Sequence, residues 1–403
     1  MASNLSDNYQ PTKNVLIVAG EASGDLHGSN LVKAMQRLQP GIRFSGIGGE
    51  KMAEVGVNIL VPASKLAVVG IFEVLAKSFS IAGAKFKLNA LLKKHPPDLL
   101  ILIDYPGFNL RLAQKAKKYG LCVLYYISPQ IWAWRQGRIK KISKIVDRMA
   151  VILPFEKDFY QNSDLKVEYV GHPLMDHIPQ ATLFEEAHRD AQIKKNPIIG
   201  ILPGSRTQEI KRLLPIMIKA LEMISANHPD MKVLLPMSTT INDELVEFVN
   251  HFLRATFLKI TILRQDLHQA LRGCDLALVT SGTATLETAI MEIPMVIVYR
   301  VSFLSYWIGK MVVKVPYIGL VNLIAENKVV PEFVQKEVTP AKLANEMLSI
   351  LESPERKTEM ARDLKMVKKR LGEPGASERT ARIALDMIYH GVFHSPKLKN
   401  RKT

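Results

Sequence analysis

A short segment of small and polar residues, 281–287, follows the apolar run 276–279. The run predicts a buried strand, Ser281-Gly282-Thr283 a turn, and the residues after it the start of a helix. Free N–H groups at such a helix start suit a phosphate, and Glu287 could accept two hydrogen bonds from a ribose diol. The segment suggests a nucleotide site, a nucleotide sugar in particular, with an ordinary capped strand–turn–helix as the alternative.

A second polar turn follows the apolar run 198–202 and contains Gly204, Ser205 and Arg206. Gly204 permits a tight turn, and Arg206 could make bidentate contacts to a diphosphate. The alternative is a surface ion pair between Arg206 and Glu209, three residues further on. We favour the phosphate contact because the turn ends a predicted strand, where ligands bind in parallel sheets.

Asp104 follows the apolar run 99–103. A carboxylate at the end of a buried strand is partly desolvated, which raises its basicity. Such a group suits a general base that removes a proton from an attacking hydroxyl. The alternative is a cap for a helix that starts near Phe108.

The glycine-rich segment 20–28 follows the first predicted strand. It lacks the Gly-x-Gly-x-x-Gly spacing of dinucleotide sites and the Gly-Lys-Ser/Thr of a P-loop. Glu21, Ser23 and Asp25 could hold sugar hydroxyls, and a helix cap by Ser23 or Asp25 is the alternative. The chain also has no Asp-x-Asp, His-Glu-x-x-His or Cys-x-x-Cys motif. We therefore expect no catalytic metal and no cofactor.

Two series of predicted strands, separated by helical patterns, must position these groups. The first series comprises residues 15–19, 44–47, 99–103, 123–127, 149–153 and 167–170. The second comprises residues 198–202, 232–236, 260–263, 276–279 and 295–298. The patterns predict an α/β protein of two doubly wound, Rossmann-like domains that face each other across a cleft. Helices are expected at residues 28–38, 210–226, 243–253, 267–272, 340–351 and 377–389.

The composition limits the classes of molecule that this protein is expected to bind. The 403 residues carry a net charge of +16, which fits nucleic acid, an anionic membrane face or phosphorylated substrates. No RNA-binding, zinc-finger or helix-turn-helix pattern is present, so nucleic acid is not expected. Two cysteines and a polar N-terminus without a signal peptide indicate a reducing compartment, the cytoplasm.

Residues 66–76 are apolar on nearly all sides, and a lysine-rich segment follows them. The segment is too short to span a bilayer. It is either a buried core helix or an interfacial helix beside basic residues that bind anionic lipid. The residues proposed for membrane contact are Leu66, Val68, Val69, Phe72 and Leu75.

Together these motifs resemble the lipid-A-disaccharide synthase family, inverting glycosyltransferases with the two-domain GT-B fold. The matching segments keep the family order over about residues 15–388, although Val321 stands where the family has proline. The resemblance implies a final helix that crosses back onto the first domain. It also implies four parts: a flexible N-terminus at 1–14, an acceptor (lipid) domain at 15–178 plus about 370–390, a UDP-sugar donor domain at 179–369, and a basic tail at 391–403.

The resemblance further implies condensation of UDP-2,3-diacylglucosamine with 2,3-diacylglucosamine 1-phosphate (lipid X). The products would be the β-1,6-linked lipid A disaccharide 1-phosphate and UDP, formed at the cytoplasmic face of the inner membrane of a Gram-negative bacterium. Asp104 would be the catalytic base. The expected UDP-sugar contacts are Gly204, Ser205, Arg206, Ser281, Gly282, Thr283, Glu287, Asn322, Gln335, Glu21 and Ser23. Alternatives are a GT-B transferase for another UDP-sugar, a GT-B epimerase and a nucleic-acid-binding protein.

Overall fold

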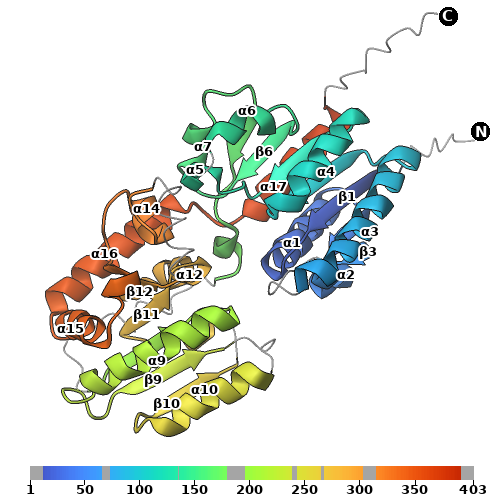
Figure 1. The fold of residues 1–403 in the computed structure, drawn as a ribbon. Helices are drawn as coiled ribbons and strands as arrows, with labels where there is room; N and C mark the ends of the chain where they lie inside the picture. Colours follow the sequence, from blue (N-terminus) through green and yellow to red (C-terminus); the bar gives the residue numbers. More distant parts are fainter. Residues whose placement is uncertain are drawn as a thin grey trace, which may run out of the picture. The chain divides into compact units, whose positions relative to one another are not determined.

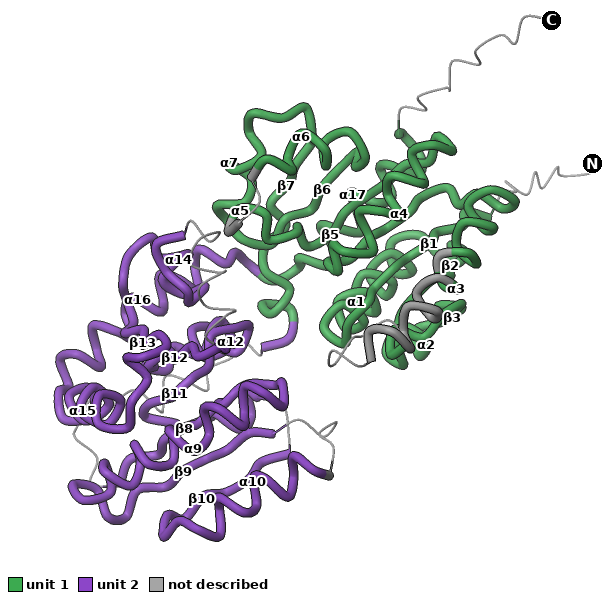
Figure 2. Tube along the Cα trace, in the orientation of Figure 1, with its two compact units in different colours: residues 1–176, 374–403 green, residues 177–373 purple. Residues whose placement is uncertain are grey.

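The computed structural model describes residues 12–65, 73–134, 136–178, 196–237, 243–264, 267–302 and 315–391 (Figure 1). Side chains are described for these residues except 73–82, 85, 133, 134, 136 and 243. Contacts divide the chain into two compact units (Figure 2). Unit 1 comprises Met1–Asp176 and Pro374–Thr403, and unit 2 comprises His177–Glu373.

Unit 1 is built on a seven-stranded parallel sheet with the order β3-β2-β1-β4-β5-β6-β7. The strands are β1 (Asn14–Ala19), β2 (Arg43–Gly48), β3 (Asn58–Pro62), β4 (Leu99–Ile103), β5 (Val123–Tyr126), β6 (Arg148–Val151) and β7 (Lys166–Tyr169). The central strands β4 and β5 are buried along their whole length, as continuous apolar runs require in a sheet covered on both faces. All six predicted strands of this series are confirmed.

Two apolar cores lie on the two faces of this sheet. Leu16 and Val18 belong to one core, and Val15 and Ile17 belong to the other, as the two-residue period of a strand dictates. The helices are α1 (Ala22–Leu38), α2 (Glu50–Glu54), α3 (Glu73–Lys94), α4 (Pro106–Lys118), α5 (Ile131–Trp134), α6 (Ile139–Ile142), α7 (Glu156–Phe159) and α17 (Ala376–Tyr389). Three short 3-10 turns complete the unit, η1 (Ala63–Lys65), η2 (Gln136–Arg138) and η3 (Pro173–Asp176).

The C-terminal helix α17 packs against α1, so the predicted return of the last helix to the first domain is confirmed. Its start is fixed by Asp176. The carboxylate of Asp176 accepts hydrogen bonds from the backbone N–H of Gly375 at 2.6 Å and of Ser377 at 3.1 Å, and from the hydroxyl of Ser377 at 2.9 Å. One carboxylate thus ties the end of η3 to the segment that re-enters unit 1, and it caps α17 where the dipole favours a negative charge.

Unit 2 contains a six-stranded parallel sheet with the order β10-β9-β8-β11-β12-β13. The strands are β8 (Ile198–Leu202), β9 (Lys232–Pro236), β10 (Ile260–Leu263), β11 (Leu276–Thr280), β12 (Met295–Tyr299) and β13 (Glu332–Val334). The helices are α9 (Thr207–Ile224), α10 (Asp243–Ala255), α11 (Leu267–Ala270), α12 (Thr283–Ile290), α14 (Leu320–Ala325), α15 (Pro340–Leu351) and α16 (Pro354–Arg370), and η4 (Gln335–Glu337) is a 3-10 turn. All five predicted strands of the second series are confirmed.

Several features differ from the sequence analysis, and one of them is helix α16, which was not predicted. The edge strands β3 and β13 were not predicted, and α1 begins at Ala22 and not near Gly28. Gly28 therefore lies inside a helix, where glycine is unfavourable. Tertiary packing explains it, because a Cβ atom on Gly28 would lie 2.7 Å from the sulfur of Met52.

Several predicted segments fall outside the described residues. Leu66, Val68, Val69 and Phe72 are among them, and Leu75 lies in α3 where only the backbone is described. Residues 1–11 and 392–403 are outside as well. None of the described helices combines the length and the apolar character that crossing a bilayer requires.

Candidate active site

Asp104 lies directly after β4, in a strained turn. Asp104 and Tyr105 have φ of +44° and +45°, the left-handed region that non-glycine residues rarely adopt. The carbonyl oxygen of Asp104 accepts hydrogen bonds from the Tyr125 hydroxyl at 2.6 Å and from Nδ2 of Asn109 at 2.7 Å. Strain of this kind persists only where surrounding contacts determine the conformation. Tyr105 is the N-cap residue of α4, so the alternative role of Asp104 as that cap is wrong.

The Asp104 carboxyl is a strengthened base. Its pKa is raised to about 6: burial and, to a lesser extent, the negative charge of Glu21 raise the pKa, and a hydrogen bond from the Tyr105 backbone lowers it. At neutral pH such a group is mostly ionised and binds a proton more strongly than an ordinary aspartate does. The structure therefore brings two predicted site residues, Asp104 and Glu21, into electrostatic contact.

The segment after β1 contains one structural carboxylate and two exposed polar residues. Asp25 is buried, and its carboxylate accepts the backbone N–H groups of Gly49 at 2.6 Å, Lys51 at 3.1 Å and Met52 at 3.2 Å. It therefore caps α2, which decides between the two roles considered for Asp25. Glu21 and Ser23 are exposed at the start of α1, and their contact to a sugar stays a prediction.

Glu156 is a buried carboxyl that the sequence analysis did not assign. Its side chain is 1% exposed and accepts hydrogen bonds from Nε1 of Trp132 at 3.1 Å and from the backbone N–H of Leu153 at 3.0 Å. The pKa of Glu156 is raised to about 7: burial is the main cause, these hydrogen bonds oppose the rise, and the charge of Asp104 adds to it. Trp132 packs edge-on against Phe155, with ring centroids 5.0 Å apart. Trp132 is itself buried, so its ring is part of the packed interior around Glu156.

The turn after β8 carries Gly204, Ser205 and Arg206. Gly204 has φ of +112°, and a Cβ atom there would lie 2.6 Å from Oε2 of Glu209, so this position requires glycine. The Arg206 guanidinium donates a hydrogen bond to Oε1 of Glu209 at 3.0 Å, while 79% of the Arg206 side chain is exposed. The alternative surface pair is formed, and the guanidinium keeps most of its surface open to solvent.

The turn after β11 opens α12, as predicted. Gly282 is the N-cap residue, and as a glycine it has no side chain to cap this helix. The Ser281 hydroxyl donates a hydrogen bond to the carbonyl oxygen of Ile318 at 3.0 Å, and Glu287 is half-buried on α12. Because β8 and β11 are paired parallel neighbours, the Arg206 turn and the Ser281–Thr283 turn lie at the same edge of the sheet.

Asn322 and Gln335 lie on elements that follow β12. The Asn322 side chain is fully buried, and its amide makes four hydrogen bonds: Nδ2 donates to Val330 O at 2.9 Å and to Glu332 Oε1 at 2.8 Å, and Oδ1 accepts from the N–H groups of Val329 at 2.9 Å and Val330 at 3.0 Å. Gln335 pairs its amide with the backbone of Val301, at 2.9 Å and 3.2 Å. The contact of both residues to a donor stays a prediction.

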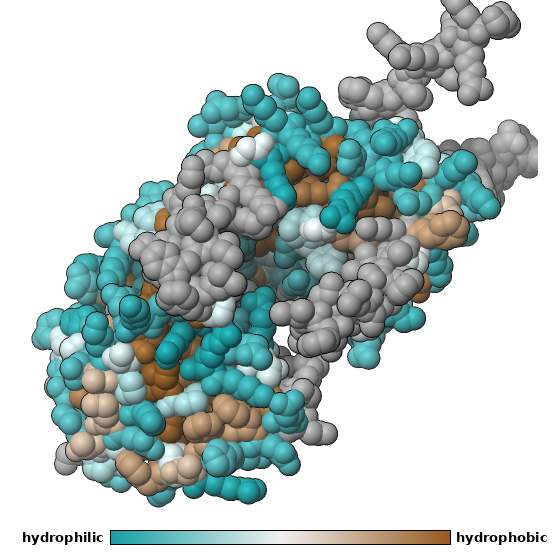
Figure 3. Space-filling model, viewed as in Figure 1, coloured by the Kyte–Doolittle hydropathy of each residue, from teal (hydrophilic) through white to brown (hydrophobic). Residues whose placement is uncertain are grey.

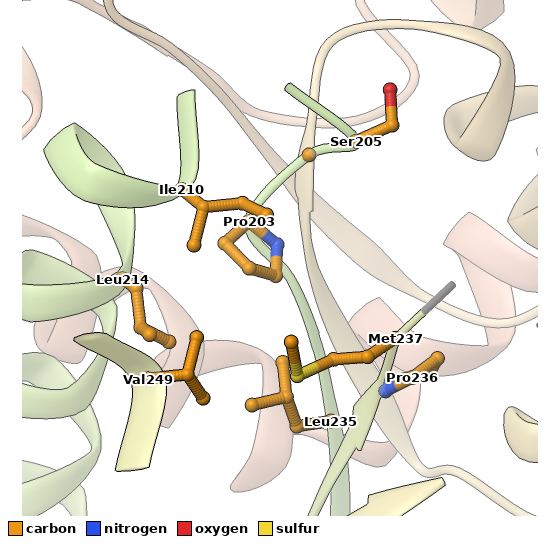
Figure 4. Close-up of a pocket in the computed structure, with 9 residues that line it drawn as sticks. Pro203, Ser205, Ile210, Leu214, Leu235, Pro236, Met237 and Val249 are labelled. Atoms are coloured by element: carbon orange, nitrogen blue, oxygen red, sulfur yellow. The ribbon is translucent and has the colours of Figure 1, made fainter. Parts of the chain in front are cut away.

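A small cavity lies beside the Gly204–Ser205 turn (Figure 4). Its volume is about 70 Å³, and Ser205 points away from the apolar side chains that line it. An apolar cavity of about 150 Å³ is needed to hold one benzene molecule, so this cavity has no room for an acyl chain. Within the described ranges, no group of three or more His, Cys, Asp or Glu side chains is placed to hold a metal ion.

Comparison with known proteins decides the family. A family model described as lipid-A-disaccharide synthetase matches residues 15–387. The chain belongs to the lipid-A-disaccharide synthase family. Relatives named lipid-A-disaccharide synthase include those of Syntrophus aciditrophicus, 45% identical over 94% of this chain and 98% of the relative, and of Nitrosococcus oceani, 42% identical over 93% and 96%. The family predicted from the sequence motifs is confirmed, and so is the predicted enzyme class, a glycosyltransferase.

Solved structures of low sequence identity support the fold of this synthase family member. The MurG structure from Acinetobacter baumannii has a TM-score of 0.59 at 16% identity and covers 94% of this chain and 100% of MurG. A UDP-GlcNAc 2-epimerase from Neisseria meningitidis, bound to UDP-GlcNAc, has a TM-score of 0.63 at 11% identity and covers 93% and 100%. At such identities the likeness concerns the fold alone, and it confirms the predicted GT-B architecture.

Proposed function

We propose that this member of the lipid-A-disaccharide synthase family condenses UDP-2,3-diacylglucosamine with lipid X. The Asp104 carboxylate takes the proton from the 6-hydroxyl of lipid X. The oxygen then bonds to the anomeric carbon of the donor while the bond from that carbon to the diphosphate breaks, and UDP leaves with the electron pair. The anomeric configuration inverts, which gives the β-1,6 linkage. The observation that carries the proposal is the half-buried Asp104 carboxyl, whose pKa is raised to about 6, in a chain that belongs to a glycosyltransferase family.

The donor binds unit 2 in this proposal. Arg206 and the N–H groups of the Ser281–Thr283 turn hold the diphosphate, with Gly204 and Ser205 shaping the neighbouring turn. Glu287 binds the ribose. Asn322 and Gln335 each exchange one of their present hydrogen bonds for a donor atom, and Glu21 and Ser23 are further proposed contacts of the UDP-sugar.

In this proposal the acceptor binds unit 1, and unit 1 also contacts the membrane surface. We propose that Leu66, Val68, Val69, Phe72 and Leu75 contact the anionic cytoplasmic face of the inner membrane. The described part of α3 supports this, because Phe86 is 79% exposed and the helix ends with the exposed basic pair Lys93 and Lys94. An exposed aromatic side chain beside lysines favours an anionic interface. On the face shown in Figure 3, hydrophilic residues predominate among those described, with hydrophobic areas between them.

The activity is tested with purified protein, UDP-2,3-diacylglucosamine, lipid X and EDTA, by measuring UDP and the phosphorylated disaccharide. We expect both products from the natural protein and neither from Asp104→Asn. Product that needs added magnesium would contradict the metal-free diphosphate site. Turnover of another UDP-sugar alone would replace the proposed donor.

Membrane contact is tested by co-sedimentation with vesicles that contain anionic phospholipid. We expect Phe86→Ser to reduce binding. Phe257→Ser is the matched control, because Phe257 is 75% exposed in unit 2. Equal loss in both variants would argue against a role specific to α3.

A further inference from the structure

Glu332, at the start of edge strand β13, accepts hydrogen bonds from three donors on one neighbouring segment. Oε1 accepts from the backbone N–H of Gly319 at 2.9 Å and from Nδ2 of Asn322 at 2.8 Å. Oε2 accepts from the backbone N–H of Ile318 at 3.0 Å. Both oxygens of one carboxylate therefore hold the entry to α14, with bonds of the charge-assisted kind.

This carboxylate is linked to the proposed diphosphate turn through one residue. The carbonyl oxygen of Ile318 accepts the hydroxyl of Ser281 at 3.0 Å, while the N–H of the same residue binds Glu332. Ser281 immediately precedes Gly282, the N-cap residue of α12. Two successive hydrogen bonds thus connect β13 to the start of the helix that faces the proposed phosphate.

Close packing restricts the conformation of the segment that joins Glu332 to the Ser281–Thr283 turn. A Cβ atom on Gly319 would lie 2.8 Å from Oε1 of Glu332 and 2.6 Å from Cδ1 of Ile297. Glycine at position 319 is therefore what permits the close approach. Gln335, three residues after Glu332, binds the backbone of Val301 with both ends of its amide, at 2.9 Å and 3.2 Å. Glu332 at the start of β13 therefore fixes the backbone that enters α14, and Gln335, just after β13, fixes the backbone that follows β12.

The three donors explain why a carboxylate stands at position 332. An ionised carboxylate has only acceptor sites, whereas a glutamine amide would turn an NH₂ group toward at least one of these N–H donors. We infer that Glu332 is a positioning residue for the donor site, which holds the Ser281–Thr283 turn and Asn322 in place for the UDP-sugar. This inference rests on the proposed function, since it assumes that the turn binds the diphosphate.

The test compares Glu332→Gln with Glu337→Gln, a control that removes an exposed carboxylate from the adjoining η4 turn. The measurements are kcat, KM for the UDP-sugar, KM for lipid X, Kd for UDP by calorimetry, and the melting temperature. For Glu332→Gln we expect KM for the UDP-sugar and Kd for UDP to rise about tenfold, the factor expected for one lost charge-assisted hydrogen bond. KM for lipid X should stay unchanged, and Glu337→Gln should match the natural protein.

A purely structural role would give a different pattern. A partly unfolded variant loses active molecules, which lowers the apparent kcat and leaves both KM values and Kd unchanged; that outcome would overturn the inference. Natural values for KM and Kd in a fully active variant would overturn it too. If the natural protein binds UDP but does not form the disaccharide, weaker UDP binding by Glu332→Gln would still support the inference while the proposed function fails.

Discussion

The hydroxyl of Tyr125 donates a hydrogen bond of 2.6 Å to the backbone carbonyl oxygen of Asp104. Burial holds the pKa of Tyr125 well above its usual range, so the phenol stays protonated and keeps donating. Because Asp104 has φ of +44°, this bond helps to hold a backbone conformation that its own residue type disfavours. A side chain from β5 thus fixes the proposed base at the end of β4.

Tyr125→Phe removes this bond and keeps the ring. We expect kcat to fall about fivefold, since one buried hydrogen bond of roughly 1 kcal/mol then no longer holds the base, while Kd for UDP stays unchanged. Tyr119→Phe is the control, because Tyr119 is 39% exposed at the end of α4. Natural kcat in Tyr125→Phe would mean that Asn109 alone holds the Asp104 carbonyl.

The raised pKa of Asp104 predicts opposite effects of pH on rate and on stability. The base must be ionised, so kcat/KM should fall about tenfold per pH unit below pH 6 and level off above it. For stability, the folded pKa of about 6 exceeds the unfolded value of 3.8. The contribution of Asp104 to stability is therefore present at low pH and lost as pH rises through about 6.

Asp104→Asn separates these two effects. At about pH 8 the variant should be inactive and more stable than the natural protein by roughly 1–3 kcal/mol, because it no longer buries a charge. At about pH 4 the two proteins should have the same stability. The measurement is urea unfolding at both pH values beside a rate profile. A variant that is less stable than the natural protein at pH 8 would contradict the burial argument.

Continuous apolar runs predicted the inner strands because a central parallel strand is buried on both faces. The edge strands β3 and β13 lack that signal, whereas the edge strands β7 and β10 were predicted. β13 has three residues, all half-buried, and β3 ends at Pro62 with exposed residues at both ends. The start of α1 was missed because Gly24 and Gly28 argue against a helix locally, and only the contact with Met52 shows why Gly28 is there.

Some residues of the candidate site could likewise be predicted from the sequence, and others could not. Asp104, Arg206 and the Ser281–Thr283 turn stand directly after predicted strands, so sequence position alone locates them. Glu332 and Glu156 bind partners that are distant in the sequence or that follow another strand. No sequence motif predicts contacts of this kind. The amide of Asn322 shows the limit most clearly, because the family resemblance implied a ligand contact and its four internal hydrogen bonds appear only in three dimensions.

Glu156→Ala should destabilise unit 1 by about 3 kcal/mol, because it leaves the indole N–H of Trp132 and the backbone N–H of Leu153 buried without an acceptor. The free energy of unfolding and the near-ultraviolet circular dichroism of the tryptophans report the change. Asp158→Ala is the control, since Asp158 is exposed on the same helix, α7. Equal stability of both variants would show that water replaces the lost acceptor.

Arg206 has an ion pair with Glu209 and a proposed contact to the diphosphate. Loss of the ion pair affects stability, whereas loss of the diphosphate contact affects the affinity for UDP. An exposed pair contributes at most about 1 kcal/mol, so Arg206→Ala should melt within a few degrees of the natural protein. Loss of a bidentate, charge-assisted contact should raise Kd for UDP by roughly 10–100-fold. Arg206→Lys should recover only part of the affinity, because an ammonium group cannot form the planar pair of bonds. If Arg206→Ala binds UDP as the natural protein does, the pair with Glu209 is the whole role of Arg206, and the diphosphate rests on α12 alone.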